Sequence, residues 1–238
     1  MIFDPPLIPA RLVRRYKRFL ADMILADGRE IVAHCPNPGS MLGLARPGAR
    51  CWLSAKTGKG RKLDFGWEIV ESESGAPDNA LVGINTAHAN RIVAEALAAG
   101  RIPGLPTEGS WRAEAVFAPG TRFDFAHTAP DGRTTWLEVK NVTLSRQPGL
   151  AEFPDARTER GARHLRDLAA AVARGHDAYL LFLVQRGDCS RLRLAADIDP
   201  AYAAAMTAAR AAGAQVQAHL CEIAATGISL GDSIPFEP

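Results

Sequence analysis

One uninterrupted apolar run constrains the fold of this chain more than any other segment. It spans residues 178–185 and reads Ala-Tyr-Leu-Leu-Phe-Leu-Val-Gln. Such a run is typical of a central strand with both faces covered, because nearly every side chain along it must be buried. A helix capped by Thr158 is expected to extend to about Arg174, and an alanine-rich helix to follow at about 200–212. The chain is therefore expected to contain an α/β domain.

The segments before and after this run continue the alternation of helices and strands. A helix capped by Asn85 or Thr86 is expected to end at about Ala99, before Gly100. Turns that contain Pro-Gly and Pro-Asp-Gly are suited to hairpins between the strands that follow. The other expected strands cover about 112–117, 122–127, 135–142 and 215–220. The resulting order, helix, three strands, helix, strand, helix, strand, is typical of an α/β sandwich.

The first third of the chain predicts a different, all-β unit. Short apolar runs separated by turn residues are typical of a small barrel. Residues 71–80, Glu-Ser-Glu-Ser-Gly-Ala-Pro-Asp-Asn-Ala, lack apolar periodicity and indicate a linker. We therefore expect two domains, residues 1–80 and 81–238. The β-rich segments expected in the first domain are 11–25, 29–34, 49–54 and 63–70.

Charge is distributed unevenly between these two units. Residues 1–62 hold 12 Lys and Arg against 4 Asp and Glu, whereas residues 63–238 hold 16 against 22. The net charge of +2 is thus the sum of +8 and −6. A basic module can release counterions from a phosphate backbone, and an acidic one can hold cations. Solvated surface charge is the alternative explanation.

The sequence predicts a cytoplasmic protein with reduced thiols. No apolar stretch reaches the roughly 18 residues needed to cross a bilayer. Asp4 and the prolines at positions 5, 6 and 9 are unlike a signal peptide. The four cysteines are too widely spaced to indicate either a disulfide framework or a zinc site.

Two acidic residues and a lysine fall on neighbouring predicted strands. Asp124 precedes the Glu138-Val-Lys140 run by fourteen residues. Strand alternation puts Glu138 and Lys140 on one face, and antiparallel pairing would bring Asp124 close to them. Adjacent carboxylates repel each other unless a cation lies between them, and their oxygens suit Mg²⁺ or Mn²⁺. Lys140 could then position or deprotonate water for attack on a phosphodiester; a surface salt bridge between Glu138 and Lys140 is the alternative.

The order of elements around this motif favours the first interpretation. It is the α-β-β-β-α-β order of the PD-(D/E)xK nuclease-like fold, with the first acid on the second strand and Glu-x-Lys on the third. Glu95 lies on the preceding helix, where some nucleases of this fold carry a further metal ligand. An exposed helix glutamate is the alternative for Glu95.

Basic residues in three segments are candidate DNA contacts. The run Arg14-Arg-Tyr-Lys-Arg-Phe19 interleaves charge with rings that could stack on bases, although Tyr16 and Phe19 also suit a core, which we favour for Phe19. The helix begun by Thr158 could direct Arg160 and His164 at a phosphate, unless it is an ordinary capped surface helix. The candidates are Arg14, Arg15, Lys17, Arg18, Lys56, Lys59, Arg61, Lys62, Arg160 and His164.

The loop at residues 35–40, Cys-Pro-Asn-Pro-Gly-Ser, is rich in turn formers. With His34 before it, its polar groups could contact phosphate. A structural turn is the alternative.

Seven stretches in the same order resemble the sugar fermentation stimulation protein A family and cover nearly the whole chain. They are RYKRFLAD (15–22), HCPNPGSM (34–41), VGINT (82–86), RFD (122–124), EVKNVTL (138–144), FPDA (153–156) and RGARHL (160–165). The resemblance implies an N-terminal OB-fold β-barrel followed by a PD-(D/E)xK nuclease-like α/β domain. It also implies DNA binding without marked sequence preference and a part in regulating sugar (maltose) utilisation.

Two positions depart from the pattern of that family. Pro38 replaces a threonine that is usual in the loop, which removes a hydroxyl. Leu63 and Phe65-Gly66 stand where tyrosines are usual, which weakens a stacking role for that strand.

Three functions are compatible with these observations. The first is a nuclease in which Asp124, Glu138 and the Val139 carbonyl hold Mg²⁺ or Mn²⁺ and the basic domain delivers DNA. The second is a DNA-binding regulator that keeps the nuclease scaffold without turnover. The third, a metabolic α/β enzyme, has no Gly-rich phosphate loop or nucleophile elbow to support it. No feature of the sequence indicates an oligomeric state.

Overall fold

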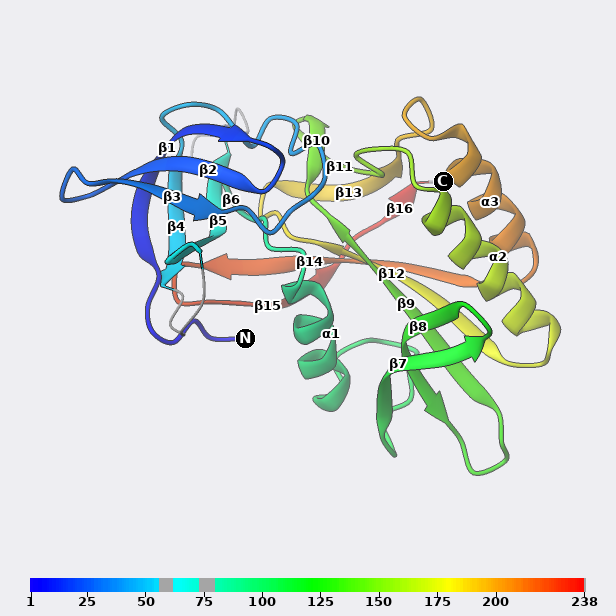
Figure 1. Ribbon diagram of the computed structural model, residues 1–238. Coiled ribbons are helices and arrows are strands. Elements are labelled where there is room, and N and C mark those ends of the chain that lie inside the picture. The colour runs from blue at the N-terminus through cyan, green and yellow to red at the C-terminus, as the bar shows by residue number, and fades with distance from the viewer. Residues whose placement is uncertain (56–61, 73–79, 238) are drawn as a thin grey trace.

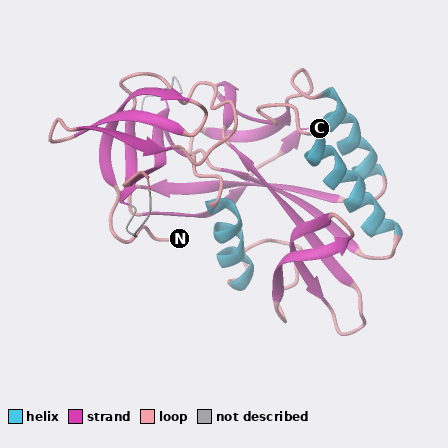
Figure 2. Cartoon of the chain, viewed as in Figure 1, coloured by secondary structure: helices cyan, strands magenta, loops and turns pink. Residues whose placement is uncertain are grey.

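The computed structural model describes residues 1–55, 62–72 and 80–237, and shows a β-barrel beside a mixed α/β unit (Figure 1). Strands outnumber helices, which lie only in the α/β unit of the described chain (Figure 2). No helix among the described residues is long and apolar enough to cross a membrane.

The first sheet closes into the expected barrel. Its strand order is β3-β2-β1-β4-β5-β6, and an additional β3–β5 pairing closes the first five strands. Leu12, Met23, Leu53 and Trp67 fill the interior, where alternate residues of each strand point. The expected OB-fold barrel is therefore confirmed. Its strands are β1 (Ile8–Tyr16), β2 (Leu20–Leu25), β3 (Glu30–His34), β4 (Arg50–Ala55), β5 (Phe65–Ser72) and β6 (Ala80–Gly83).

A hairpin turn divides the β-rich run expected at 11–25. Strands β1 and β2 pair antiparallel, with Tyr16 opposite Leu20. Lys17 and Arg18 form the turn with φ of 47° and 65°. Residues other than glycine rarely adopt this left-handed conformation, so the sequence gives no turn signal here.

The barrel sheet continues past residue 80. Strand β6 pairs antiparallel with β5 over Ile69–Ser72, so Glu71, Ser72 and Ala80, expected in a linker, belong to strands. The rest of the expected linker, 73–79, lies outside the described residues.

The second sheet has the order β15-β14-β12-β9-β8-β7 and follows the predicted α-β-β-β-α-β core. Strands β9, β12 and β14 run parallel, and β8 pairs antiparallel with β9. Strand β12, buried at every residue after Asp177, lies in the middle, as the apolar run predicts. The elements are α1 (His88–Ala98), β7 (Trp111–Ala118), β8 (Thr121–Thr128), β9 (Thr134–Val142), α2 (Glu159–Ala173), β12 (Asp177–Val184), α3 (Pro200–Ala211), β14 (Gln215–Ala224) and β15 (Gly227–Ser233).

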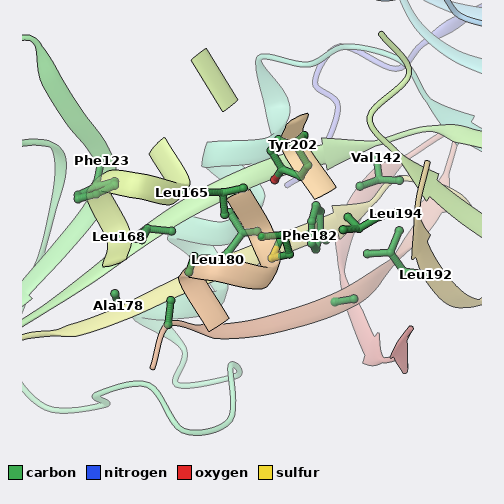
Figure 3. Close-up of a cluster of buried hydrophobic side chains, with 14 of the residues drawn as sticks. Phe123, Val142, Leu165, Leu168, Ala178, Leu180, Phe182, Leu192, Leu194 and Tyr202 are labelled. Atoms are coloured by element: carbon green, nitrogen blue, oxygen red, sulfur yellow. The ribbon is translucent and has the colours of Figure 1, made fainter. Parts of the chain in front are cut away.

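Helices cover both faces of this sheet. Helices α2 and α3 pack on one face, where Leu165 and Tyr202 meet Leu180 and Phe182 of β12 (Figure 3). Helix α1 covers the other face through a separate apolar cluster that includes Ile92 and Leu181. This two-sided burial explains why β12 has almost no polar residues.

A small third sheet was not predicted. It has the order β10-β11-β13-β16. Its strands are short, and Leu-Ser-Arg-Gln in β10 carries no clear alternation, so periodicity could not reveal them. They are β10 (Leu144–Gln147), β11 (Gly149–Phe153), β13 (Cys189–Leu194) and β16 (Phe236–Glu237).

Among the described residues, backbone hydrogen bonds tie both ends of the barrel segment to the α/β unit. Gly83 N donates to Gln185 O at 3.0 Å, immediately beyond β12. At the other end, Phe3 N donates to Thr226 O at 2.9 Å, between β14 and β15. The segment that leads into the barrel and the strand that leaves it therefore both contact the second unit.

Candidate metal and phosphodiester site

Glu138 is the centre of a buried polar cluster on β9. It is 3% exposed. Its Oε1 accepts a hydrogen bond from Lys140 Nζ at 2.5 Å and another from His164 Nδ1. Strand alternation directs Glu138 and Lys140 to the same face, as predicted, and α2 brings His164 to that face. The cluster thus combines a carboxylate, an ammonium and an imidazole.

Asp124 joins the cluster from β8. Its Oδ2 accepts from Val139 N and its Oδ1 from Asn90 Nδ2 of α1, both at 2.7 Å. Phe125 opposite Leu137 is the pair of the β8–β9 ladder nearest to Asp124. The Asp124 side chain therefore takes the place of a backbone acceptor where the two strands stop pairing.

The two carboxyl groups have different proton affinities. Burial raises the pKa of Asp124 above its usual value, and the negative charge of Glu138 adds to this effect. Burial also acts to raise the pKa of Glu138, but the His164 hydrogen bond and the Lys140 charge outweigh it and hold that pKa below its usual value. Glu138 is thus the stronger acid, and a nearby cation would favour ionisation of Asp124.

The donor set fits a hard divalent cation. Glu138 Oε2 is buried and has no hydrogen-bond partner in the described structure. A buried oxygen without a partner is costly unless a ligand satisfies it. Mg²⁺ is usually held by one or two carboxylates and several waters. Glu138 and Asp124 would be the residues that hold the ion.

Glu95 does not belong to this cluster. Its carboxylate, 49% exposed, pairs with the Met1 amine at 2.7 Å and with Arg91 at 3.2 Å. Five residues turn a helix by about 140°, so Glu95 points away from the side on which Asn90 reaches Asp124. The described residues contain no group of three or more His, Cys, Asp or Glu suited to a metal ion. Asn90, rather than the expected Glu95, is the residue of α1 that contacts Asp124.

Asn90 was missed by the sequence reasoning. It lies three residues before Val93, which is buried on the apolar side of α1. The sequence feature that could have identified Asn90 is its position as a polar residue next to the apolar stripe of its helix.

The predicted contact residues of α2 have different environments. His164 is only 3% exposed, and its hydrogen bond to Glu138 makes it a positioning group rather than a surface contact. Arg160 is exposed, and its Nε donates to His164 Nε2 at 3.3 Å. This network assigns the remaining imidazole proton to Nδ1, where it can donate to Glu138.

The basic residues of the barrel also separate into two groups. Arg14 pairs with Asp22 at 2.7 Å, and Arg15 donates to the carbonyls of Asn37 and Gly39 at 2.9 Å. Arg15 therefore braces the 37–40 loop, which supports the alternative that this loop is a structural turn. Arg14 is exposed but paired, whereas Lys17, Arg18 and Lys62 are exposed and have no ion pair among the described residues.

Phe19 is 53% exposed at the end of the hairpin turn, so our preference for a core position was wrong. It follows Lys17 and Arg18, and the three form an exposed basic tip. Lys56, Lys59 and Arg61 lie outside the described residues.

A closed OB barrel joined to a nuclease-like α/β domain defines the class of this protein. Residues 13–84 match the family model described as the SfsA N-terminal OB domain, and residues 87–227 match that of the sugar fermentation stimulation protein RE domain. The chain belongs to the sugar fermentation stimulation protein family.

Relatives span the full chain. A sugar fermentation stimulation protein homolog of Azorhizobium caulinodans is 50% identical over 99% of each chain. A homolog of Dinoroseobacter shibae is 49% identical over 100% of this chain and 96% of its own. The solved structure described as Pyrococcus furiosus SfsA in complex with Ca²⁺ has a TM-score of 0.85 at 22% identity and covers 100% of this chain and 98% of its own. The fold is thus shared over the whole length.

Proposed function

We propose that this protein binds DNA largely without sequence preference and hydrolyses phosphodiester bonds with Mg²⁺ or Mn²⁺ at Asp124, Glu138 and Lys140. The observation that carries the proposal is Glu138 Oε2, a buried oxygen without a partner in the described structure. The other oxygen of Glu138 bonds to Lys140, and Asp124 of β8 is near enough for the charge of Glu138 to raise its pKa. A protein that only bound DNA would gain nothing from two acids next to phosphate.

Each residue has a distinct task in this proposal. Glu138 and Asp124 hold the cation, which would stabilise charge that develops on the phosphate. Lys140, 15% exposed at its side chain, orients the attacking water through its ammonium. His164 keeps Glu138 ionised and oriented through the Nδ1 hydrogen bond.

The description of the Pyrococcus structure supports a cation in this family. That protein is described as being in complex with Ca²⁺. Ca²⁺ and Mg²⁺ are both hard ions that prefer oxygen ligands. A carboxylate pair in this chain provides such ligands.

A cleavage assay tests the catalytic part of the proposal. End-labelled single- and double-stranded DNA and RNA are incubated with the protein and Mg²⁺ or Mn²⁺. We expect cleavage that stops when the cation is chelated. Binding without cleavage on every substrate would leave the alternative, a non-catalytic DNA-binding regulator of sugar utilisation genes, in its place.

The basic tip is the proposed DNA contact of the barrel. The double substitution Lys17→Glu/Arg18→Glu should weaken DNA binding and lower the slope of log K against log salt by roughly 2, because about one counterion is released per phosphate contact. Phe19→Ala should weaken binding to single strands by about 1–3 kcal/mol through lost stacking. Fluorescence anisotropy at salt concentrations between about 50 and 300 mM measures both effects, because the affinity that phosphate contacts supply changes strongly over roughly this range.

Arg29→Glu is the control for the tip. Arg29 is exposed but pairs with Asp27 at 2.7 Å in the β2–β3 turn. This single charge reversal, half the charge change of the double substitution, should leave the salt slope near the parental value. If it lowers the slope by half as much as the double substitution, binding reflects net charge and the tip has no special role.

A further inference from the structure

A cavity of about 190 Å³ lies where the barrel meets the α/β unit. The 37–39 loop of the barrel forms one wall, and β9, β11 and the residues that follow them form the other. Pockets for drug-sized ligands occupy roughly 300–1,000 Å³, so this one suits a smaller group. The lining residues used below are Asn37, Thr86, Asn141, Thr143, Phe153 and Asp155.

The walls of the cavity are held in place without a ligand. Asp155 Oδ2 accepts from Ser40 N at 2.9 Å across the domain junction. A Cβ added at Gly39 would lie 2.2 Å from that oxygen, so only glycine allows this approach. Arg15 holds the loop from behind through its carbonyls. The cavity is therefore preformed.

Two amide groups present donors that the protein does not use. Asn37 Oδ1 accepts from Gly39 N at 2.8 Å, and Asn141 Oδ1 accepts from Gln185 Nε2 at 2.5 Å. These bonds fix the orientation of each amide, and neither Nδ2 has an acceptor among the described residues. The hydroxyl of Thr143 also lacks a partner there. The cavity thus offers several hydrogen-bond donors to a ligand.

Charge on the lining argues against a phosphate. No Lys or Arg lines the cavity in the described structure, whereas Asp155 and Glu152 do. Glu152 is already neutralised by Arg146 and Arg193, at 2.8 and 2.9 Å. Asp155 Oδ1 has no described partner. The free groups are therefore amide donors, hydroxyls and one carboxylate oxygen.

We propose that this cavity holds one unpaired nucleobase of the bound DNA, and that guanine fits it best. Guanine presents acceptors at O6 and N7, which amide donors can reach, and neighbouring N–H groups at N1 and N2, which a carboxylate can accept. Phe153 supplies an aromatic wall, as in sites that bind bases removed from the stack.

The cavity lies near the proposed cleavage site along β9. Asn141 is three residues from Glu138, which is about 10 Å along the strand, or roughly three base-pair steps, and the two side chains point to opposite faces of the sheet. The inference rests on the proposed function, because it states which DNA the proposed cleavage site would select. Its substrate is DNA with a bulged or single-stranded guanine near the cleaved bond.

Anisotropy with three hairpin DNAs tests the proposal: one fully paired, one with a single bulged guanine and one with a bulged adenine. The full-length protein should bind the guanine bulge roughly tenfold more tightly than the paired hairpin. Asn141→Leu and Asp155→Asn should each abolish this preference and leave affinity for the paired hairpin unchanged. Asp232→Asn, which removes an exposed carboxylate of β15, should keep the preference.

The outcomes separate this inference from the proposed function. Equal affinity of the parent protein for all three hairpins would overturn the base pocket and leave DNA binding intact. If the parent binds no hairpin, the proposed function fails, and calorimetry with guanosine decides the cavity alone. Saturable binding of guanosine that Asn141→Leu removes would support the cavity as a base site, and no heat of binding would overturn it.

Discussion

Lys140→Met should lower the metal-dependent cleavage rate by about 10²–10⁴-fold, the usual contribution of a positioned acid or base. Methionine retains the length of the half-buried stem and removes only the ammonium, which bonds to Glu138 Oε1 at 2.5 Å. Single-turnover rates on labelled DNA at saturating Mn²⁺ measure the loss. DNA affinity without metal should stay near the parental value. Parental cleavage by Lys140→Met would exclude Lys140 from the reaction.

Glu138→Gln should prevent cation binding, whereas Lys140→Met should remove only the ammonium, so comparing the two variants separates these two losses. A ligand at 100 times its Kd stabilises the folded state by about 2.7 kcal/mol. In a protein of this size that corresponds to a rise in Tm of roughly 5–10 °C. The parent and Lys140→Met should both show this rise with Mn²⁺, whereas Glu138→Gln should show little. An equal rise in all three would place the cation elsewhere.

Arg186→Met should destabilise the protein by about 3–5 kcal/mol, the cost of leaving one member of a buried ion pair alone. Arg186 is 3% exposed and donates to Asp188 Oδ2 at 2.7 Å. It also donates to Thr143 O at 2.9 Å and to Ser72 Oγ of the barrel at 3.1 Å. One guanidinium thus joins β5, the residue that follows β9 and the segment after β12. Urea denaturation measures the change in the free energy of unfolding.

The double variant Arg186→Met/Asp188→Leu is the control for a charge effect. Apolar replacement of a whole buried pair is often neutral or stabilising. We therefore expect the double variant to recover most of the lost stability. A single variant within about 1 kcal/mol of the parent would show that solvent reaches Asp188.

Local patterns predicted the parts of the site that lie on one strand or on adjacent strands. Glu138 and Lys140 share a face because they are two residues apart, and the β8–β9 hairpin brings Asp124 near them. The apolar run at 178–185 likewise required a covered central strand. In each case neighbours in sequence determine the neighbours in space.

Contacts between distant segments were beyond the reach of these patterns. The orientation of α1 selects Asn90 over Glu95, and it depends on packing against the sheet. Arg15 carries the same charge as Lys17, yet it reaches carbonyls more than twenty residues away. Phe19 has an apolar side chain but lies at a tip that the left-handed turn pushes outward. Tertiary contacts decided all three.

The sequence patterns did not predict the cavity at the domain junction either. Its walls come from four of the seven stretches that resemble the family, but no periodicity relates them. The loop at 35–40 was interpreted only as a turn or a phosphate contact. Ser40 of this loop donates a hydrogen bond to Asp155, 115 residues further along the chain, and only folding brings the two residues together.

The two backbone ties between barrel and α/β unit bear on how a long polymer would be accommodated. Phe3 holds the segment before β1, and Gly83 holds the end of β6. A module anchored by a single hinge can swing closed over its ligand, whereas one anchored at both entry and exit resists such rotation. The nucleic acid would therefore have to bend or open to follow the protein, and its local deformability would decide where it is held.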